Sequence, residues 1–119
     1  MQLSFTYKHI KSSPDVNAYA TKKLSKLNKY KDFKFIEAKY VFSTAKDNSI
    51  HIAELVLSIK NDTISAKVEA ENMYQAIDSV VIKIGKQLEK KKTSYIKSRQ
   101  VKDKNSNEET DIDDEEDFE

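Results

Sequence analysis

Lysine side chains that recur at helical spacing are the residues of this chain best suited to a chemical task. At about 100° per residue, one set falls on a single side of a helix between residues 83 and 97, and another does so between residues 22 and 29. The two sets are Lys83, Lys86, Lys90 and Lys97, and Lys22, Lys26 and Lys29. Because a lysine ammonium contacts phosphate as a flexible point charge, these sets could bind the backbone of a polyanion. A solvated helix face fits the same pattern, so both interpretations stay open at this point.

The sequence contains no catalytic constellation. Its single glycine, Gly85, lies inside a predicted helix, which excludes a glycine-rich phosphate loop. The two histidines, His9 and His51, have no metal-ligand spacing with nearby carboxylates, and there is no cysteine. We therefore predict that the protein is not an enzyme and has no catalytic residue, metal site, cofactor or small-molecule substrate.

Charge divides the chain into two parts. Residues 1–104 hold all 21 basic and 11 of the acidic residues, whereas residues 105–119 hold nine acidic residues and no basic one. A basic body is attracted to nucleic acid or to anionic membranes, and an acidic end is typical of an interaction tail. We predict one domain over residues 1–98 and a disordered, polar-to-acidic tail over residues 99–119. No apolar run is long enough to span a bilayer, so we expect a cytoplasmic protein without a membrane partner.

Two amphipathic helices would carry the lysine sets. The first begins at Ser13, a good N-cap, and Pro14, and runs to Tyr30. Its apolar stripe comprises Val16, Ala20, Leu24 and Leu27. The second lies within residues 69–92, with an apolar stripe of Met73, Ile77, Val80, Val81, Ile84 and Leu88. Asp78 and Glu89 fall on the flank of this helix opposite its lysines.

Alternation of apolar and polar residues predicts four strands, near residues 1–8, 36–43, 52–59 and 63–70. In the second strand, Ile36, Ala38, Tyr40 and Phe42 are expected on the buried face. Lys46–Ser49 and Asn61–Asp62 are turn material. The predicted order is β-α-β-β-β-α, an α+β fold with a four-stranded sheet and two helices packed on one face.

One stretch is recognisable as a family signature. The run Asn72-Met73-Tyr74-Gln75-Ala76-Ile77-Asp78, followed by an apolar, lysine-bearing helix, resembles the ribosome hibernation-promoting factor and protein Y family. The familiar form of this signature begins with Asp where this chain has Asn72, and both residues are good N-caps. The resemblance covers about residues 1–98, and it implies a fold like a double-stranded-RNA-binding domain preceded by an extra strand.

This resemblance also implies a function. A protein of this kind occupies the mRNA and tRNA decoding channel of the small ribosomal subunit, inhibits translation and keeps idle ribosomes inactive. The residues expected to contact ribosomal RNA are Lys22, Lys23, Lys26, Lys29, Lys83, Lys86 and Lys90, with Lys91, Lys92 and Lys97 as possible additional contacts. The acidic tail resembles that of protein Y, which implies inactive single ribosomes more than ribosome dimers.

Two other classes of function remain open. A generic double-stranded RNA-binding chaperone or processing cofactor would usually carry lysines at the start of its last helix, whereas this chain has Asn72–Gln75 there. Alternatively, the domain is a protein-interaction module whose acidic tail binds a basic partner and whose lysines only keep it soluble.

Overall fold

The computed structural model describes the backbone of residues 1–97 and the side chains of residues 1–92. Its elements are β1 (Gln2–Tyr7), α1 (Pro14–Leu24), the 3₁₀ helix η1 (Ser25–Lys29), β2 (Phe35–Ala45), β3 (Ile50–Ile59), β4 (Asp62–Ala70) and α2 (Met73–Lys97). The predicted order of strand, helix, three strands and helix is confirmed, as is the α+β class. The predicted tail, residues 99–119, lies outside the described residues.

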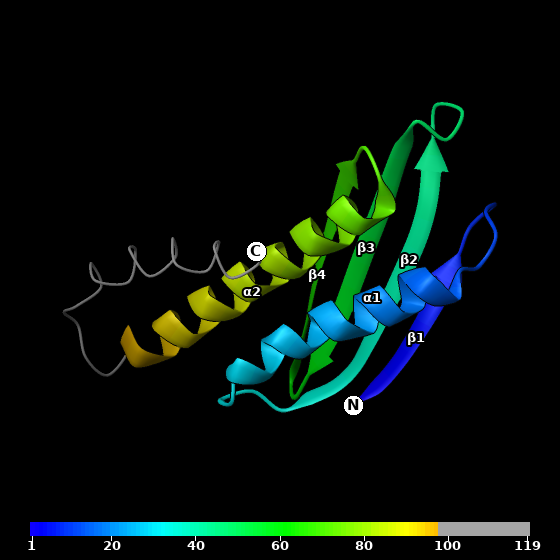
Figure 1. The fold of residues 1–119 in the computed structure, drawn as a ribbon. Coiled ribbons are helices and arrows are strands. Elements are labelled where there is room, and N and C mark those ends of the chain that lie inside the picture. Colours follow the sequence, from blue (N-terminus) through cyan, green and yellow to red (C-terminus); the bar gives the residue numbers. More distant parts are fainter. Residues whose placement is uncertain (98–119) are drawn as a thin grey trace.

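The four strands form one sheet in the order β1-β2-β3-β4. β1 pairs with β2 in parallel, and the other two pairs are antiparallel. Figure 1 shows α1 and α2 lying side by side across one face of this sheet, with β1 and β4 at its edges. The helices therefore form one layer and the sheet a second, and no helix or strand of residues 1–97 covers the far face of the sheet.

Each strand contributes its alternating apolar side chains to the core. In β3 these are Ala53, Leu55, Leu57 and Ile59, all of which are buried. Where β1 joins β2, the rings of Phe5, Tyr40 and Phe42 stack, with centroids 5.4 to 6.2 Å apart. The two pairs that Phe5 makes across the strands, with Tyr40 and with Phe42, stabilise the sheet at its parallel edge.

The prediction for Ile36 is wrong. Its side chain is 48% exposed, while Phe35 packs against the core instead. The pairing of β2 with β3 shifts register between Phe35 and Glu37, and such a bulge reverses the faces of the residues before it. The alternation from Ala38 onward follows the prediction.

Tyr40 joins the sheet to the helix layer. Its ring is fully buried, and its hydroxyl donates a hydrogen bond to the carbonyl oxygen of Ala20 at 3.0 Å. Burial raises the pKa of Tyr40 because the phenolate would be desolvated. The six residues predicted as the apolar stripe of α2 are all buried in the same core.

Side-chain caps fix where both helices begin. Ser13 Oγ accepts from the backbone N–H of Val16 at 3.2 Å, and Asn72 Oδ1 accepts from that of Gln75 at 2.9 Å. Asn72 therefore caps α2 as an aspartate would. The first helix differs from prediction at its other end, because α1 stops at Leu24 and the chain continues as η1. None of the described helices combines the length and apolar character needed to cross a membrane.

Candidate nucleic-acid interface

The first lysine row (Lys22, Lys26 and Lys29) lies on the solvent side of α1 and η1. All three residues are exposed. The change from α-helix to 3₁₀ helix keeps this row in line, because residues three apart eclipse one another in a 3₁₀ helix. The ammonium of Lys29 lies 5.5 Å from the centre of the Tyr30 ring, whose burial holds this end of the row against the core.

Lys23 differs from the lysines of this row. Its side chain is only 15% exposed, and its ammonium lies 3.4 Å from Oδ1 of Asp78 on α2. The same ammonium lies 5.4 Å from the centre of the Tyr19 ring. Lys23 thus joins the two helices, and part of its charge is already balanced within the fold.

Tyr19 and Tyr74 complete the contact between the helices. The Tyr19 hydroxyl donates to Oδ1 of Asp78 at 2.8 Å, and the Tyr74 ring meets the Tyr19 ring edge to face at 4.9 Å. Burial and, second, the hydrogen bond to Asp78 raise the pKa of Tyr19 to about 12. We call Tyr19, Lys23, Tyr74 and Asp78 the interhelical cluster. The sequence placed Asp78 on the flank opposite the lysines, and the structure shows that this flank contacts α1.

The second lysine row (Lys83, Lys86 and Lys90) lies along α2, and all three residues are exposed. At about 100° per residue they fall within an arc of about 60°. The neighbouring residues Ile84 and Leu88 are buried, so the arc faces away from the sheet. The structure therefore confirms the exposure that phosphate contact requires, while leaving the contact itself as a prediction.

Gly85 sets how closely α2 approaches the first helix. A Cβ atom added there would lie 3.3 Å from the Tyr30 hydroxyl and 3.7 Å from Leu27 Cδ2. The missing side chain lets the α2 backbone pack closely against the side chains of Leu27 and Tyr30, and this close approach explains a glycine inside a helix. Gly85 thereby helps to fix the separation of the two lysine rows.

The three possible additional lysines are placed differently. Lys91 forms an ion pair with Asp62 at the start of β4, and Lys92 lies 3.6 Å from Asp32. The hydrogen bond from Lys91 is the main cause that lowers the pKa of Asp62. Lys97 belongs to α2, but its side chain lies outside the described part of the chain. Lys91 and Lys92 thus have acidic neighbours, which the sequence alone did not reveal.

The interhelical cluster was not predicted as a unit. Tyr19 and Asp78 are far apart in sequence, so no local spacing relates them, and only the packing of α1 against α2 brings them together. Across residues 1–97, no group of three His, Cys, Asp or Glu side chains is arranged to hold a metal ion.

A family model described as "Sigma 54 modulation protein / S30EA ribosomal protein" matches residues 3–95. The ribosome hibernation promoting factor of Salmonella typhimurium is 30% identical over 92 residues, which is 77% of this chain and 94% of that protein. The corresponding factor of Klebsiella oxytoca is 31% identical over 93 residues, with the same coverage.

Two solved structures have a similar fold. A ribosomal subunit interface protein from Coxiella burnetii superposes with a TM-score of 0.71 at 25% identity, covering 77% of this chain and 98% of that one. The Protein Y N-terminal domain of Thermus thermophilus gives a TM-score of 0.68 at 24% identity, covering 76% and 98%.

Proposed function

Because the chain belongs to the Sigma 54 modulation protein / S30EA ribosomal protein family, we propose that it is a ribosome-binding hibernation factor, which inhibits translation and keeps idle ribosomes inactive. The observation that carries this proposal is the match over residues 3–95, which include both lysine rows. Its relatives are named as ribosome hibernation promoting factors, a family without enzymatic activity. The protein acts in the cytoplasm, where ribosomes are found.

The binding site that we propose is the decoding channel of the small subunit. In this channel the domain lies where mRNA and tRNA would bind, and it excludes them sterically. The channel wall is ribosomal RNA, whose backbone is a dense array of phosphates. Two lysine rows on one rigid helix layer can contact separate stretches of that backbone at once.

The contacts are not equally strong in this proposal. Lys22, Lys26, Lys29, Lys83, Lys86 and Lys90 contact phosphates directly, because all six are exposed. Lys23 contributes less, since it must keep or exchange its contact with Asp78. Lys91, Lys92 and Lys97 remain additional contacts, and the first two exchange an acidic neighbour for phosphate when they take part.

Co-sedimentation with separated ribosomal subunits over a range of salt concentrations tests the proposal. We expect binding to the small subunit and not to the large one, and inhibition of translation in a cell-free system. If six to eight phosphates are neutralised, the slope of log affinity against log salt should have a magnitude of about 4 to 7. Affinity independent of salt would contradict the electrostatic contact, and selective binding to the large subunit would contradict the proposed location.

A plain RNA duplex in the same titration separates this proposal from a general double-stranded RNA-binding protein. The start of α2 offers no lysine to a duplex, since Asn72 caps the helix, Met73 is buried and Gln75 is uncharged. We therefore expect much weaker binding to the duplex than to the small subunit. Equal affinities would favour the general RNA-binding function.

A further inference from the structure

The two edges of the sheet differ in how they are protected against pairing with another strand. At the β4 edge, the side-chain amide of Gln87 on α2 donates to the carbonyl oxygen of Ser65 at 2.8 Å, and Lys91 pairs with Asp62. Lys67 adds a further exposed charge to this strand. Side-chain cover and charges of this kind are how folded proteins prevent association through a sheet edge.

The β1 edge has none of these features. Its residues, Gln2–Tyr7, include no charged residue and no proline, and they pair with β2 without a bulge. No other described strand pairs with β1, and Figure 1 shows it at the border of the sheet. Two of the three large hydrophobic residues that the described part of the chain exposes, Met1 and Ile36, directly precede the paired residues Gln2 and Glu37. This edge is therefore partly apolar and open to a further strand.

One hydrogen bond shows which backbone groups point to the free edge. The N–H of Lys8, directly after β1, donates to the carbonyl oxygen of Phe42 on β2 at 2.9 Å. Successive residues of a strand direct their N–H and C=O groups to opposite sides, so those of Leu3, Phe5 and Tyr7 point away from β2. These three residues thus offer alternating donors and acceptors to another strand.

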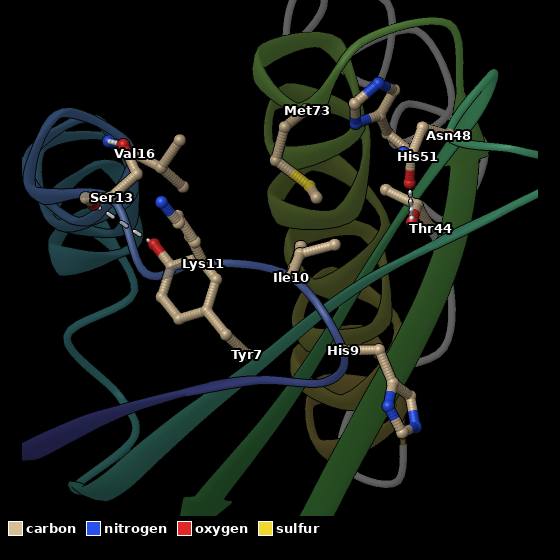
Figure 2. Close-up of a pocket in the computed structure, with 10 residues that line it drawn as sticks. All are labelled: Tyr7, His9, Ile10, Lys11, Ser13, Val16, Thr44, Asn48, His51 and Met73. Carbon is tan, nitrogen blue, oxygen red and sulfur yellow. Dashed lines mark hydrogen bonds between the residues drawn. The ribbon is translucent and has the colours of Figure 1, made fainter.

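The part of α1 next to this edge is also uncharged. The Tyr7 hydroxyl lies 2.8 Å from Asn17 Oδ1 and 3.1 Å from the carbonyl oxygen of Ser13, toward which Figure 2 shows it pointing. Thr21, one turn along the same flank, donates to the Asn17 carbonyl oxygen. The first lysine row faces elsewhere, because the five residues from Asn17 to Lys22 turn a side chain by about 140°. On a basic domain, this flank and β1 form a strip without charges that would repel a second copy.

We propose that two copies of the chain pair through antiparallel β1 strands, which joins their sheets into one. In a register centred on Phe5, the two Phe5 residues exchange backbone hydrogen bonds, and Leu3 of each copy does so with Tyr7 of the other. All of these groups point to the free edge, so the pairing leaves the existing bonds between β1 and β2 intact.

An identical strand suits this edge because the pairing is self-complementary about a two-fold axis. In the same register, Lys8 lies opposite Gln2 of the second copy, so no like charges meet across residues 2–8. The full chain has a formal net charge of only +1, which keeps the long-range repulsion between copies small. This association goes beyond the proposed ribosome function and does not depend on it.

Sedimentation equilibrium of the full chain over a range of concentrations tests the association. We expect the average mass to rise from that of a monomer toward that of a dimer as concentration increases. The dissociation constant should be in the micromolar range, because one short pair of strands makes a small interface. A monomer at every concentration up to the submillimolar range would overturn the proposal.

Charge variants test whether β1 is the surface that pairs. In the proposed register Ser4 lies opposite Thr6 of the second copy, and both residues are exposed. Ser4→Glu combined with Thr6→Glu therefore puts like charges opposite one another and should abolish the dimer, as should Ser4→Lys combined with Thr6→Lys. An equimolar mixture of the two variants should form a heterodimer, because opposite charges then face one another.

The matched control places two glutamates on the other edge strand. Thr63→Glu combined with Ser65→Glu changes exposed residues of β4 and should leave the dimer intact. Circular dichroism checks that every variant is folded. A dimer that persists in the β1 variants, an equal loss in the β4 control, or a mixture that stays monomeric would refute pairing through β1.

Discussion

Lys22 and Lys23 are adjacent in sequence but lie in different environments. Lys22 is exposed in the first lysine row, whereas the Lys23 side chain is 15% exposed and paired with Asp78 in the interhelical cluster. One residue along a helix rotates a side chain by about 100°, which is enough to move an ammonium from solvent to the contact between two helices. The position on the helix, more than the residue type, decides whether a lysine contacts the neighbouring helix or faces solvent.

The interhelical cluster and the second lysine row also differ in how their charges affect the free energy of folding. In the interhelical cluster, Asp78 accepts from Tyr19 and pairs with Lys23, so opposite charges and donors are matched. In the second lysine row, Lys86 lies three and four residues from Lys83 and Lys90, a spacing that costs a few tenths of a kcal/mol per like-charged pair. The like-charged neighbours within this row repel one another, and a bound polyanion would relieve that repulsion.

The largest effect should follow from reversing the second lysine row. Replacing Lys83, Lys86 and Lys90 by Glu would remove the three proposed phosphate contacts, each a charge-assisted hydrogen bond, so ribosome affinity should fall by roughly 100-fold or more. The fold should persist, because exposed substitutions typically cost within about 0.5 kcal/mol each. Co-sedimentation measures the affinity, and circular dichroism checks the fold.

The matched control for this triple variant lies on strands β2 and β4 and on the turn between β3 and β4. Lys39, Lys60 and Lys67 are also exposed, and replacing them by Glu changes the net charge equally. If both triple variants lose the same affinity, net charge alone explains binding and the second lysine row has no special role.

Breaking the interhelical cluster should affect stability more than binding. Asp78→Ala removes the acceptor of Tyr19 and the partner of Lys23, and at this half-buried site we expect a loss of about 1 to 2 kcal/mol in urea unfolding. The change should also lower the pKa of Tyr19 from its value of about 12, because the hydrogen bond to Asp78 helps to raise it. Glu69→Ala, which removes an exposed carboxylate of β4, is the control and should cost less than about 0.5 kcal/mol. Equal stability of the two variants would contradict a structural role for the cluster.

Removing residues 105–119 tests whether the acidic tail competes with RNA for the two lysine rows. The deletion takes away nine acidic residues and no basic one, so attraction to RNA should rise. We expect the truncated chain to bind a plain RNA duplex several-fold more tightly at low salt, and the difference should shrink as salt shortens the Debye length to about 8 Å. Equal affinities at low salt would exclude shielding by the tail.

The smallest effect is expected at Gly85. Alanine gains about 1 kcal/mol in helix propensity, but its Cβ would lie 3.3 Å from the hydroxyl of the buried Tyr30, so α2 or η1 must shift slightly. The gain in helix propensity and the cost of this shift nearly cancel, so we expect the free energy of unfolding in urea to change by less than about 1 kcal/mol. A gain of the full helix propensity would show that the close approach of the helices carries no constraint.

Local patterns in the sequence predicted most of the fold. The apolar stripes, the Ser13 and Asn72 caps and the turn at Lys46–Ser49 each depend on residues near one another in the chain, and the structure bears them out. Ile36 was misplaced because a bulge depends on the partner strand, which a single segment does not reveal.

The parts of the site that escaped prediction all depend on long-range packing. The sequence placed Asp78 on the correct flank of α2, but it could not show that this flank faces α1 and captures Lys23. For the same reason the sequence did not reveal that β1 lies at a free edge of the sheet, since the order of the strands depends on the fold. The exposure of the two lysine rows could be predicted, because it follows from helical spacing alone.

Lysine footprinting on the ribosome tests the central claim most directly. The full chain, alone and bound to small subunits, is treated briefly with an acylating reagent, and modification is quantified at each lysine by mass spectrometry. The proposal predicts that both lysine rows are modified in the unbound protein and protected on the ribosome, that Lys39, Lys60 and Lys67 are modified in both states, and that Lys23 reacts slowly throughout. Protection of Lys39, Lys60 and Lys67 with continued modification of the two lysine rows would contradict it.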